Sequence, residues 1–138
     1  MKYDQLIQLY FERSTALQWY WTIYVLVIGG LLAYSSFRQT RDLITTALVT
    51  VLFSFFAYKN LDAIHDVTRE RFATLQLIKE SAPTGPEAAD VKRVRELLDP
   101  TLDLATPEWE GVRNFHVVSD LLTIATLWAM ERRRKKVA

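Results

Sequence analysis

The chain has 138 residues, of which 50% are apolar and 24% are charged, and its formal net charge is +1. This balance excludes a strongly basic nucleic-acid-binding domain, and the absence of cysteine excludes disulfides, thiolate zinc sites and iron–sulfur clusters. The mean hydropathy of +0.03 is that of a soluble protein, but the apolar residues lie in blocks: 14–37 and 43–58 carry no charge, and 114–130 carry only Asp120. These blocks predict an all-α integral membrane protein with three transmembrane helices, the second extended well beyond the bilayer, plus short amphipathic helices.

The N-terminal part is predicted to form an amphipathic segment over 1–15, followed by transmembrane helix 1 over 16–36. Apolar residues recur at helical spacing in the first segment, which is expected either to lie at the membrane surface or to form the first turns of a helix that continues into the bilayer. The uncharged run of 24 residues gives about 36 Å of helix, more than a bilayer core of ~30 Å requires. Gly29, Gly30 and Ala33 place small side chains on one side of this helix, where another helix can approach closely.

Transmembrane helix 2 is predicted over 42–81, with a span of about 43–60 and an extension outside the bilayer. Its uncharged run of 16 residues gives about 24 Å of helix, which is short for a bilayer, so Lys59 is expected to extend its ammonium group toward the interface. No proline or glycine occurs between residues 43 and 82. Because these are the residues that end helices, one continuous helix is expected.

The segment over 82–107 is predicted to be a loop that contains a short amphipathic helix over 91–99, because proline, glycine and small residues dominate its first part. Transmembrane helix 3 is predicted over 108–131, with a span of about 113–130. A hydroxyl residue, a proline and an acid precede it, which is typical of a helix start. A basic tail over 132–138 follows.

The tail contains five consecutive basic residues, Arg132, Arg133, Arg134, Lys135 and Lys136. By the positive-inside rule they predict a multi-pass membrane protein whose C-terminus is cytoplasmic and whose N-terminus and 60–112 segment lie on the opposite side. The same five residues are predicted to contact anionic lipid headgroups. The alternative is that they act only as a topology signal.

Asp120 is the sharpest single feature, because it is an acid inside a 17-residue apolar run. A carboxylate at this depth costs about 2.5–3.5 kcal/mol, so such residues face a protein interior or water. His116 lies four residues earlier on the same helix face, and Lys59 of the preceding span is predicted as a partner of either residue. Two interpretations stay open for the three residues: ion- or proton-binding positions, or structural bonds that hold the helix to its neighbours.

A polar stripe recurs at intervals of four residues along the second span and comprises Asp42, Thr46, Thr50, Ser54, Tyr58 and Asp62. It can line a hydrated path, or it can allow close helix packing with each hydroxyl bonded to its own helix. Farther along the same helix, Asp62, His65 and Asp66 place two carboxylates and an imidazole on one face. This set predicts a metal site, and the alternative is a solvated polar face.

The chain shows no arrangement typical of a nucleophile with its base or of paired catalytic acids, so no enzyme activity and no cofactor are expected. The first hypothesis is an accessory or scaffold subunit, or a self-assembling module, of a membrane complex, because three helices enclose little interior. Expected partners are the lipid bilayer and copies of the chain or other membrane subunits, without nucleic acid. The alternative is a homo-oligomeric ion or proton channel that uses Asp120 and His116, and the third hypothesis is a membrane metal-binding protein or enzyme.

Overall fold

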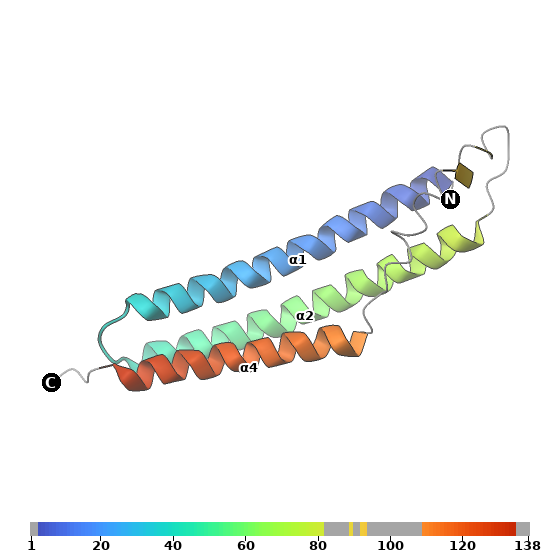
Figure 1. Ribbon diagram of the computed structural model, residues 1–138. Coiled ribbons are helices and arrows are strands. Elements are labelled where there is room, and N and C mark those ends of the chain that lie inside the picture. The colour runs from blue at the N-terminus through green and yellow to red at the C-terminus, as the bar shows by residue number, and fades with distance from the viewer. Residues whose placement is uncertain (1–2, 82–88, 90–91, 94–108, 135–138) are drawn as a thin grey trace.

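The computed structural model describes residues 3–81, 89, 92–93 and 109–134 (Figure 1). Its helices there are α1 (Tyr3–Phe37), α2 (Leu43–Glu80) and α4 (Trp109–Arg133). The predicted all-α class is confirmed for this part of the chain. The predicted loop over 82–107 and its helix over 91–99 fall mainly outside the described residues, as do Lys135 and Lys136 of the basic tail.

Helix α1 is continuous over its 35 residues and is about 52 Å long. The sequence allowed the N-terminal segment to be either a separate surface helix or the start of a longer helix. In the structure, residues 3–15 form the first turns of α1. Asp4 in the first turn lies at the positive end of the helix dipole.

Helix α2 has 38 residues, which correspond to about 57 Å. It begins after Asp42, whose carboxylate accepts hydrogen bonds from the Thr45 backbone N–H at 3.1 Å and from the Thr45 hydroxyl at 2.6 Å. This cap satisfies donors of the first turn that have no partner within the helix. The helix ends at Ser81, two residues before the first proline of the chain.

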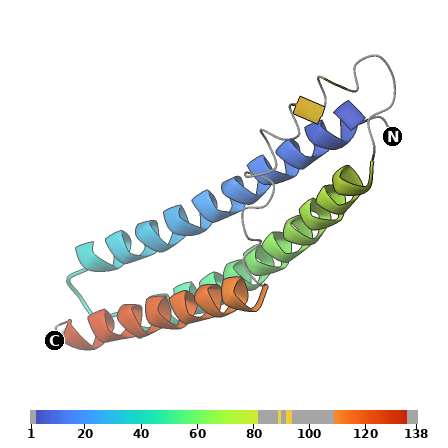
Figure 2. The same cartoon turned by 45° about the vertical axis from the view of Figure 1, so that its right-hand side comes forward.

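The three helices form an elongated antiparallel bundle, which Figures 1 and 2 show from two sides. Helices α1 and α2 lie side by side along their length, and the shorter α4 packs along the half of α2 that follows the α1–α2 connection. The ring of Trp109, the first residue of α4, lies 4.6 Å from the ring of His65 and marks where α4 begins beside α2. Beyond this point α1 and α2 continue as a pair.

The buried residues of α2 follow a repeat close to 3.5, with separations of three, four or seven positions apart from one adjacent pair. They are Thr46, Phe53, Ala57, Asn60, Ile64, Val67, Thr74, Leu75 and Ile78. This spacing is the seam of an antiparallel coiled-coil-like contact, in which one narrow face of each helix meets its neighbours. The wide remaining face of each helix is left exposed.

The far end of the α1–α2 pair has a core of its own, formed by Leu6, Tyr10, Leu75 and Ile78. Arg71 covers this core: its guanidinium lies 5.0 Å from the centroid of the Tyr10 ring and donates a 2.7 Å hydrogen bond to the Tyr10 hydroxyl. Each fully buried apolar side chain stabilises such a contact by about 1.5–3 kcal/mol. The two helices therefore have a core contact of their own in which α4 takes no part.

The outer surface is strongly apolar in the half of the bundle that contains the α1–α2 connection. Large apolar side chains are exposed on all three helices, among them Val25, Leu26, Ile44, Leu48, Phe55, Phe115, Val118, Leu121 and Leu122. Within the described ranges, α1 and α2 are long and apolar enough to cross a membrane, whereas α4 does not reach the same hydropathy. Soluble monomers rarely expose so continuous an apolar surface.

Candidate functional site

Two polar clusters join the three helices. The mid-bundle cluster consists of Tyr24 of α1, Asn60 of α2, and His116 and Asp120 of α4. The loop-end cluster, at the α1–α2 connection, consists of Ser35, Arg38, Asp42, Thr46, Glu131 and Arg134.

The carboxylate of Asp120 lies at the centre of the mid-bundle cluster. The Tyr24 hydroxyl donates a 2.8 Å hydrogen bond to one carboxylate oxygen, and Nδ1 of His116 lies 2.8 Å from the other oxygen. The Tyr24 hydroxyl also lies 3.2 Å from the carbonyl oxygen of His116. Both oxygens of the acid thus have a partner inside the bundle, as buried polar groups require.

His116 is fully buried and connects all three helices. Its ring stacks on the ring of Tyr24 with the centroids 4.1 Å apart, and Nε2 lies 3.3 Å from the side-chain nitrogen of Asn60. In the tautomer with its proton on Nδ1, the ring donates to Asp120 and Nε2 accepts from the Asn60 amide. A continuous series of polar contacts therefore runs from α2 through α4 to α1.

The predicted pairing of Lys59 with Asp120 or His116 is not formed. The Lys59 side chain is 76% exposed, and its Nζ lies 3.8 Å from a carboxylate oxygen of Asp62. The neighbouring residue, Asn60, faces the bundle instead, because successive residues on a helix are about 100° apart. Tyr24 and Asn60 were missed by the sequence reasoning. The signal for both is their position on the buried face of the 3.5-residue repeat.

Glu131 is the fully buried centre of the loop-end cluster. One carboxylate oxygen accepts a 2.6 Å hydrogen bond from the backbone N–H of Asp42, and the other accepts a 2.9 Å hydrogen bond from the Thr46 hydroxyl. Arg134 also donates to this second oxygen, and Nη1 of Arg38 lies 3.8 Å from it. Glu131 thereby ties the end of α4 to the start of α2.

The two arginines of this cluster tie the same point to the end of α1. Arg134 donates to the Ser35 hydroxyl at 2.7 Å, to the Ser35 carbonyl oxygen, and to the Arg38 carbonyl oxygen at 3.0 Å. Arg38 donates to the Thr46 hydroxyl at 3.1 Å and to the Asp42 carbonyl oxygen at 3.2 Å. The last carbonyl groups of α1 have no partner within the helix, and Arg134 supplies one.

The surroundings of Glu131 lower its pKa. Burial raises the pKa, but the hydrogen bonds from Thr46, from Arg134 and from the backbone of Asp42 favour the charged form and outweigh burial. The pKa of Asp42 is lowered as well, chiefly by the hydrogen bonds from the Thr45 side chain and backbone. Both carboxylates are therefore charged at neutral pH.

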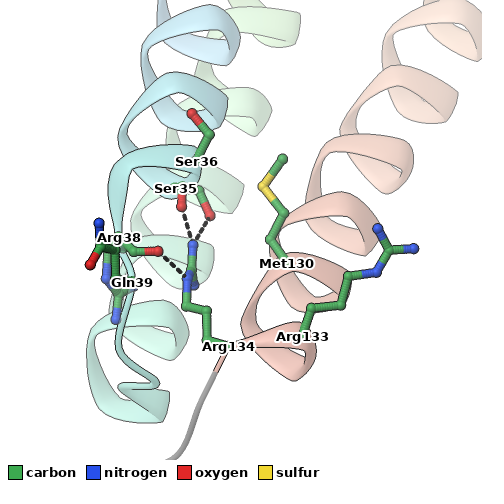
Figure 3. Close-up of a pocket in the computed structure, with 7 residues that line it drawn as sticks. All are labelled: Ser35, Ser36, Arg38, Gln39, Met130, Arg133 and Arg134. Atoms are coloured by element: carbon green, nitrogen blue, oxygen red, sulfur yellow. Dashed lines mark hydrogen bonds between the residues drawn. The ribbon is translucent and has the colours of Figure 1, made fainter.

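A pocket of about 500 Å³ opens beside this cluster, between the ends of α1 and α4. It is lined by Ser35, Ser36, Arg38, Gln39, Met130, Arg133 and Arg134. Figure 3 shows Met130 and Arg134 directed toward the end of α1, and Arg133 standing apart from them. Of the tail residues predicted to contact lipid headgroups, Arg132 and Arg133 are exposed, whereas the Arg134 side chain is turned inward and is only 6% exposed.

The polar stripe predicted along α2 does not stay on the contact face. Thr46 is buried, but Ser54 and Asp62 are exposed. Residues four positions apart on a helix point in directions that differ by about 40°, so a stripe with a four-residue repeat moves gradually around the helix. It therefore departs from a buried face whose repeat is 3.5 residues. The hydroxyls of Thr50 and Ser54 bond to the carbonyl oxygens four residues earlier, at 2.8 Å each, which fits the packing interpretation.

The three residues predicted as metal ligands have other neighbours. Asp62 pairs with Lys59, while His65 lies against Trp109 and 3.5 Å from Asp66. No group of three or more histidine or acidic side chains within the described ranges is placed to hold a metal ion. The metal hypothesis for Asp62, His65 and Asp66 therefore has no support in this structure.

The small-residue face of α1 is also not used within the bundle. Gly29, Gly30 and Ala33 are exposed, and no atom lies within 4 Å of the position that a Cβ would take at either glycine. The predicted close approach of another helix at this face is therefore not made by α2 or α4.

The two clusters join the helices to one another, and the loop-end cluster also borders the pocket. Tyr24 and His116 are 2% and 0% exposed, so they offer no surface to a substrate. Comparisons with protein families, with curated proteins and with solved structures give no match to this chain. The proposed function therefore depends on the geometry alone.

Proposed function

We propose that this chain is a multi-pass membrane protein whose three helices cross the bilayer and which acts without catalysis, as an accessory or scaffold subunit or a self-assembling module of a membrane complex. One observation carries the proposal. The polar groups at the helix contacts are bonded to one another inside the bundle, while the outward faces of the helices are apolar. A bundle of this kind anchors and assembles rather than binding a substrate.

The positions of charged and aromatic residues support a membrane placement. Each uncharged run has one end at the loop-end cluster: the first run ends at Phe37, the second begins at Leu43 and the third ends at Met130. A hydrocarbon core of ~30 Å corresponds to about 20 residues of helix, measured from that end. The opposite boundary then falls near Leu17 of α1 and Glu110 of α4, and Trp19 and Trp109 lie within two residues of it, as expected for interfacial aromatic residues.

The contacts of Asp120 support the third span. Asp120 precedes Glu131 by 11 residues, so it lies about 16 Å from the loop end and inside the proposed core. Its hydrogen bond with Tyr24 and its contact with His116 offset the cost of placing a carboxylate there. The exposed side of α4 carries Phe115 and Leu121, which are 64% and 62% exposed and are suited to lipid contact.

The pair formed by α1 and α2 beyond the proposed bilayer supports the scaffold role. Its own core keeps the two helices together there. Phe11, Phe72 and Leu77 are 51%, 45% and 51% exposed on this pair. Exposed apolar side chains outside the bilayer favour contact with another protein.

The topology is tested by single cysteines, for which the cysteine-free chain is its own unlabelled control. Gln39→Cys, Gln76→Cys and Arg132→Cys place one thiol each at exposed positions. With a membrane-impermeant maleimide in right-side-out vesicles, residue 76 is expected to label directly, and residues 39 and 132 only after permeabilisation. Labelling of 132 together with 76 would contradict the third span, and a fully reversed pattern would contradict the orientation alone.

The role is tested with the full chain purified in mild detergent. We expect a homo-oligomer or a second membrane polypeptide at constant stoichiometry, and proton and potassium leaks in liposomes no faster than those of protein-free liposomes. A lone monomer would contradict the proposal.

The channel alternative keeps one supporting observation, the continuous contacts from Asn60 to Tyr24. It requires the bundle to open, because the Asp120 and His116 side chains are only 17% and 0% exposed. A proton or potassium flux that is lost in Asp120→Asn would favour the channel over the scaffold.

A further inference from the structure

The pocket between the ends of α1 and α4 is cationic. Arg38, Arg133 and Arg134 line it, and none of its seven lining residues is acidic. The described residues at this end carry five arginines and two carboxylates, a net charge of +3: Arg38, Arg41, Arg132, Arg133 and Arg134 against Asp42 and Glu131. A concave surface with such a surplus concentrates anions.

Two of the three arginines of the pocket are already positioned. Arg134 is held by Glu131 and Ser35, and the Arg38 side chain, 16% exposed, is held by Thr46. Arg133 has no hydrogen bond or ion pair with the described part of the chain, and Figure 3 shows its guanidinium apart from the other two. A ligand that enters therefore finds two fixed cations and one that is free to close on it, which limits the entropy lost on binding.

The pocket lies at the level where the uncharged runs end. Phe37, on the last turn of α1, is exposed beside it, and Met130 supplies an apolar wall. In the proposed bilayer placement this is the depth of the headgroup phosphates of one leaflet, and in the predicted orientation it is the cytoplasmic leaflet, which carries the anionic lipids. Guanidinium groups bind phosphate oxygens in a two-pronged geometry.

We infer that this pocket binds the phosphate of an anionic phospholipid. Arg133 and Arg38 supply the charge, Gln39 supplies a neutral donor, and the acyl chains leave past Met130 along the exposed apolar surface. A volume of about 500 Å³ suits a headgroup of this size. The inference rests on the proposed membrane placement, because that placement brings phosphates to this depth.

The test uses the full chain in nanodiscs of equal phosphatidylglycerol and phosphatidylcholine, with the retained lipids counted by native mass spectrometry. We expect phosphatidylglycerol to be enriched on the wild type. Arg133→Gln is expected to lower this enrichment about fivefold, which corresponds to about 1 kcal/mol for one basic residue near an anionic surface. Gln39→Glu, which places an acid in the lining, is expected to lower it as well.

Arg132→Gln is the matched control, because this neighbouring arginine is exposed, undergoes the same change of charge and does not line the pocket. We expect it to change the enrichment less than twofold. Equal losses in the two arginine variants would mean diffuse attraction by surface charge and would overturn the inference, as would a wild type without preference. Displacement of the lipid by millimolar inorganic phosphate would instead identify a soluble anion as the ligand and would overturn the lipid assignment. If cysteine labelling gives the expected topology but the nanodiscs show no lipid preference, this inference alone is rejected. If the labelling contradicts the three spans, the proposed function is rejected.

Discussion

Replacing Glu131 by glutamine tests whether the loop-end cluster holds α4 in the bundle. The carboxylate accepts from the Asp42 N–H at 2.6 Å, from the Thr46 hydroxyl at 2.9 Å and from Arg134. A glutamine of the same shape keeps one accepting oxygen and turns an NH₂ group toward these donors. Because Thr46 and Arg134 share one oxygen, the variant keeps either these two bonds or the Asp42 bond, and in both cases it loses the negative charge beside Arg134.

The magnitude follows from these contacts. A hydrogen bond to a charged group contributes about 1.5–3 kcal/mol, and breaking a buried ion pair costs about 3–5 kcal/mol. Because Arg134 keeps its bonds to Ser35 and to the Arg38 carbonyl oxygen, we expect the lower part of this range, about 3 kcal/mol. At about 3–4 °C per kcal/mol for a chain of this size, the melting temperature falls by roughly 10 °C.

The measurement is thermal unfolding in detergent, followed as the loss of the monodisperse species at one fixed heating rate. Glu110→Gln is the matched control, since this acid lies exposed at the other end of α4, and we expect it to shift the melting temperature by less than about 2 °C. Thr46→Val combined with Glu131→Gln is expected to cost less than the sum of the single variants, because they share one hydrogen bond. If Glu131→Gln melts within about 2 °C of the wild type, the cluster does not hold α4 and the reasoning is refuted.

Four further predictions concern pH, the mid-bundle acid, the distal core and the glycine face. The pKa values of Glu131 and Asp42 are lowered on folding, so their contribution to stability is complete above the ordinary carboxyl pKa of about 4 and is lost as the pH falls through the folded values. The melting temperature should therefore stay level as the pH is lowered from about 7 and should drop as the pH approaches about 3, less steeply in Glu131→Gln. Asp120→Ala, which removes both bonded oxygens, is expected to destabilise the bundle by roughly 1–2 kcal/mol in detergent melts, and Asp120→Asn by less. Ile78→Ala, at a fully buried position, should cost about 2–4 kcal/mol and raise amide exchange at the distal end of the α1–α2 pair without exposing α4. Gly29→Ala should not lower the melting temperature of the isolated chain, because no atom lies within 4 Å of the new methyl group, and the higher helix propensity of alanine should raise it by about 3 °C.

The helices could be predicted closely from the sequence, because their signals are local. The predicted segments over 42–81 and 108–131 correspond to α2 (Leu43–Glu80) and α4 (Trp109–Arg133). Charge-free runs and the positions of proline are visible in a single sequence. The predicted N-terminal segment differs only in being continuous with the span that follows it.

The partners within the two clusters could not be predicted, because they depend on how each long helix is rotated about its axis. Lys59 and Asn60 are neighbours in sequence, and only the phase of the buried repeat decides which of them meets His116. The same holds for Arg134, which looks like one more residue of a basic tail but reaches back to Ser35, 99 residues earlier in the chain. An error of one position rotates a helix face by about 100°.

The distribution of the two clusters explains how the least apolar helix keeps its place. Helices α1 and α2 are long and apolar enough to cross a membrane, and α4 does not reach the same hydropathy. The two clusters bond to α4 near both of its ends, at His116 and at Glu131, which are 15 residues or about 22 Å apart. Since the partners of α4 in both clusters are supplied by α1, α2 and their connection, we expect α4 to be fixed only where these two helices have paired. Loss of one cluster should therefore free one end of α4, and loss of both should release the helix while the α1–α2 pair remains.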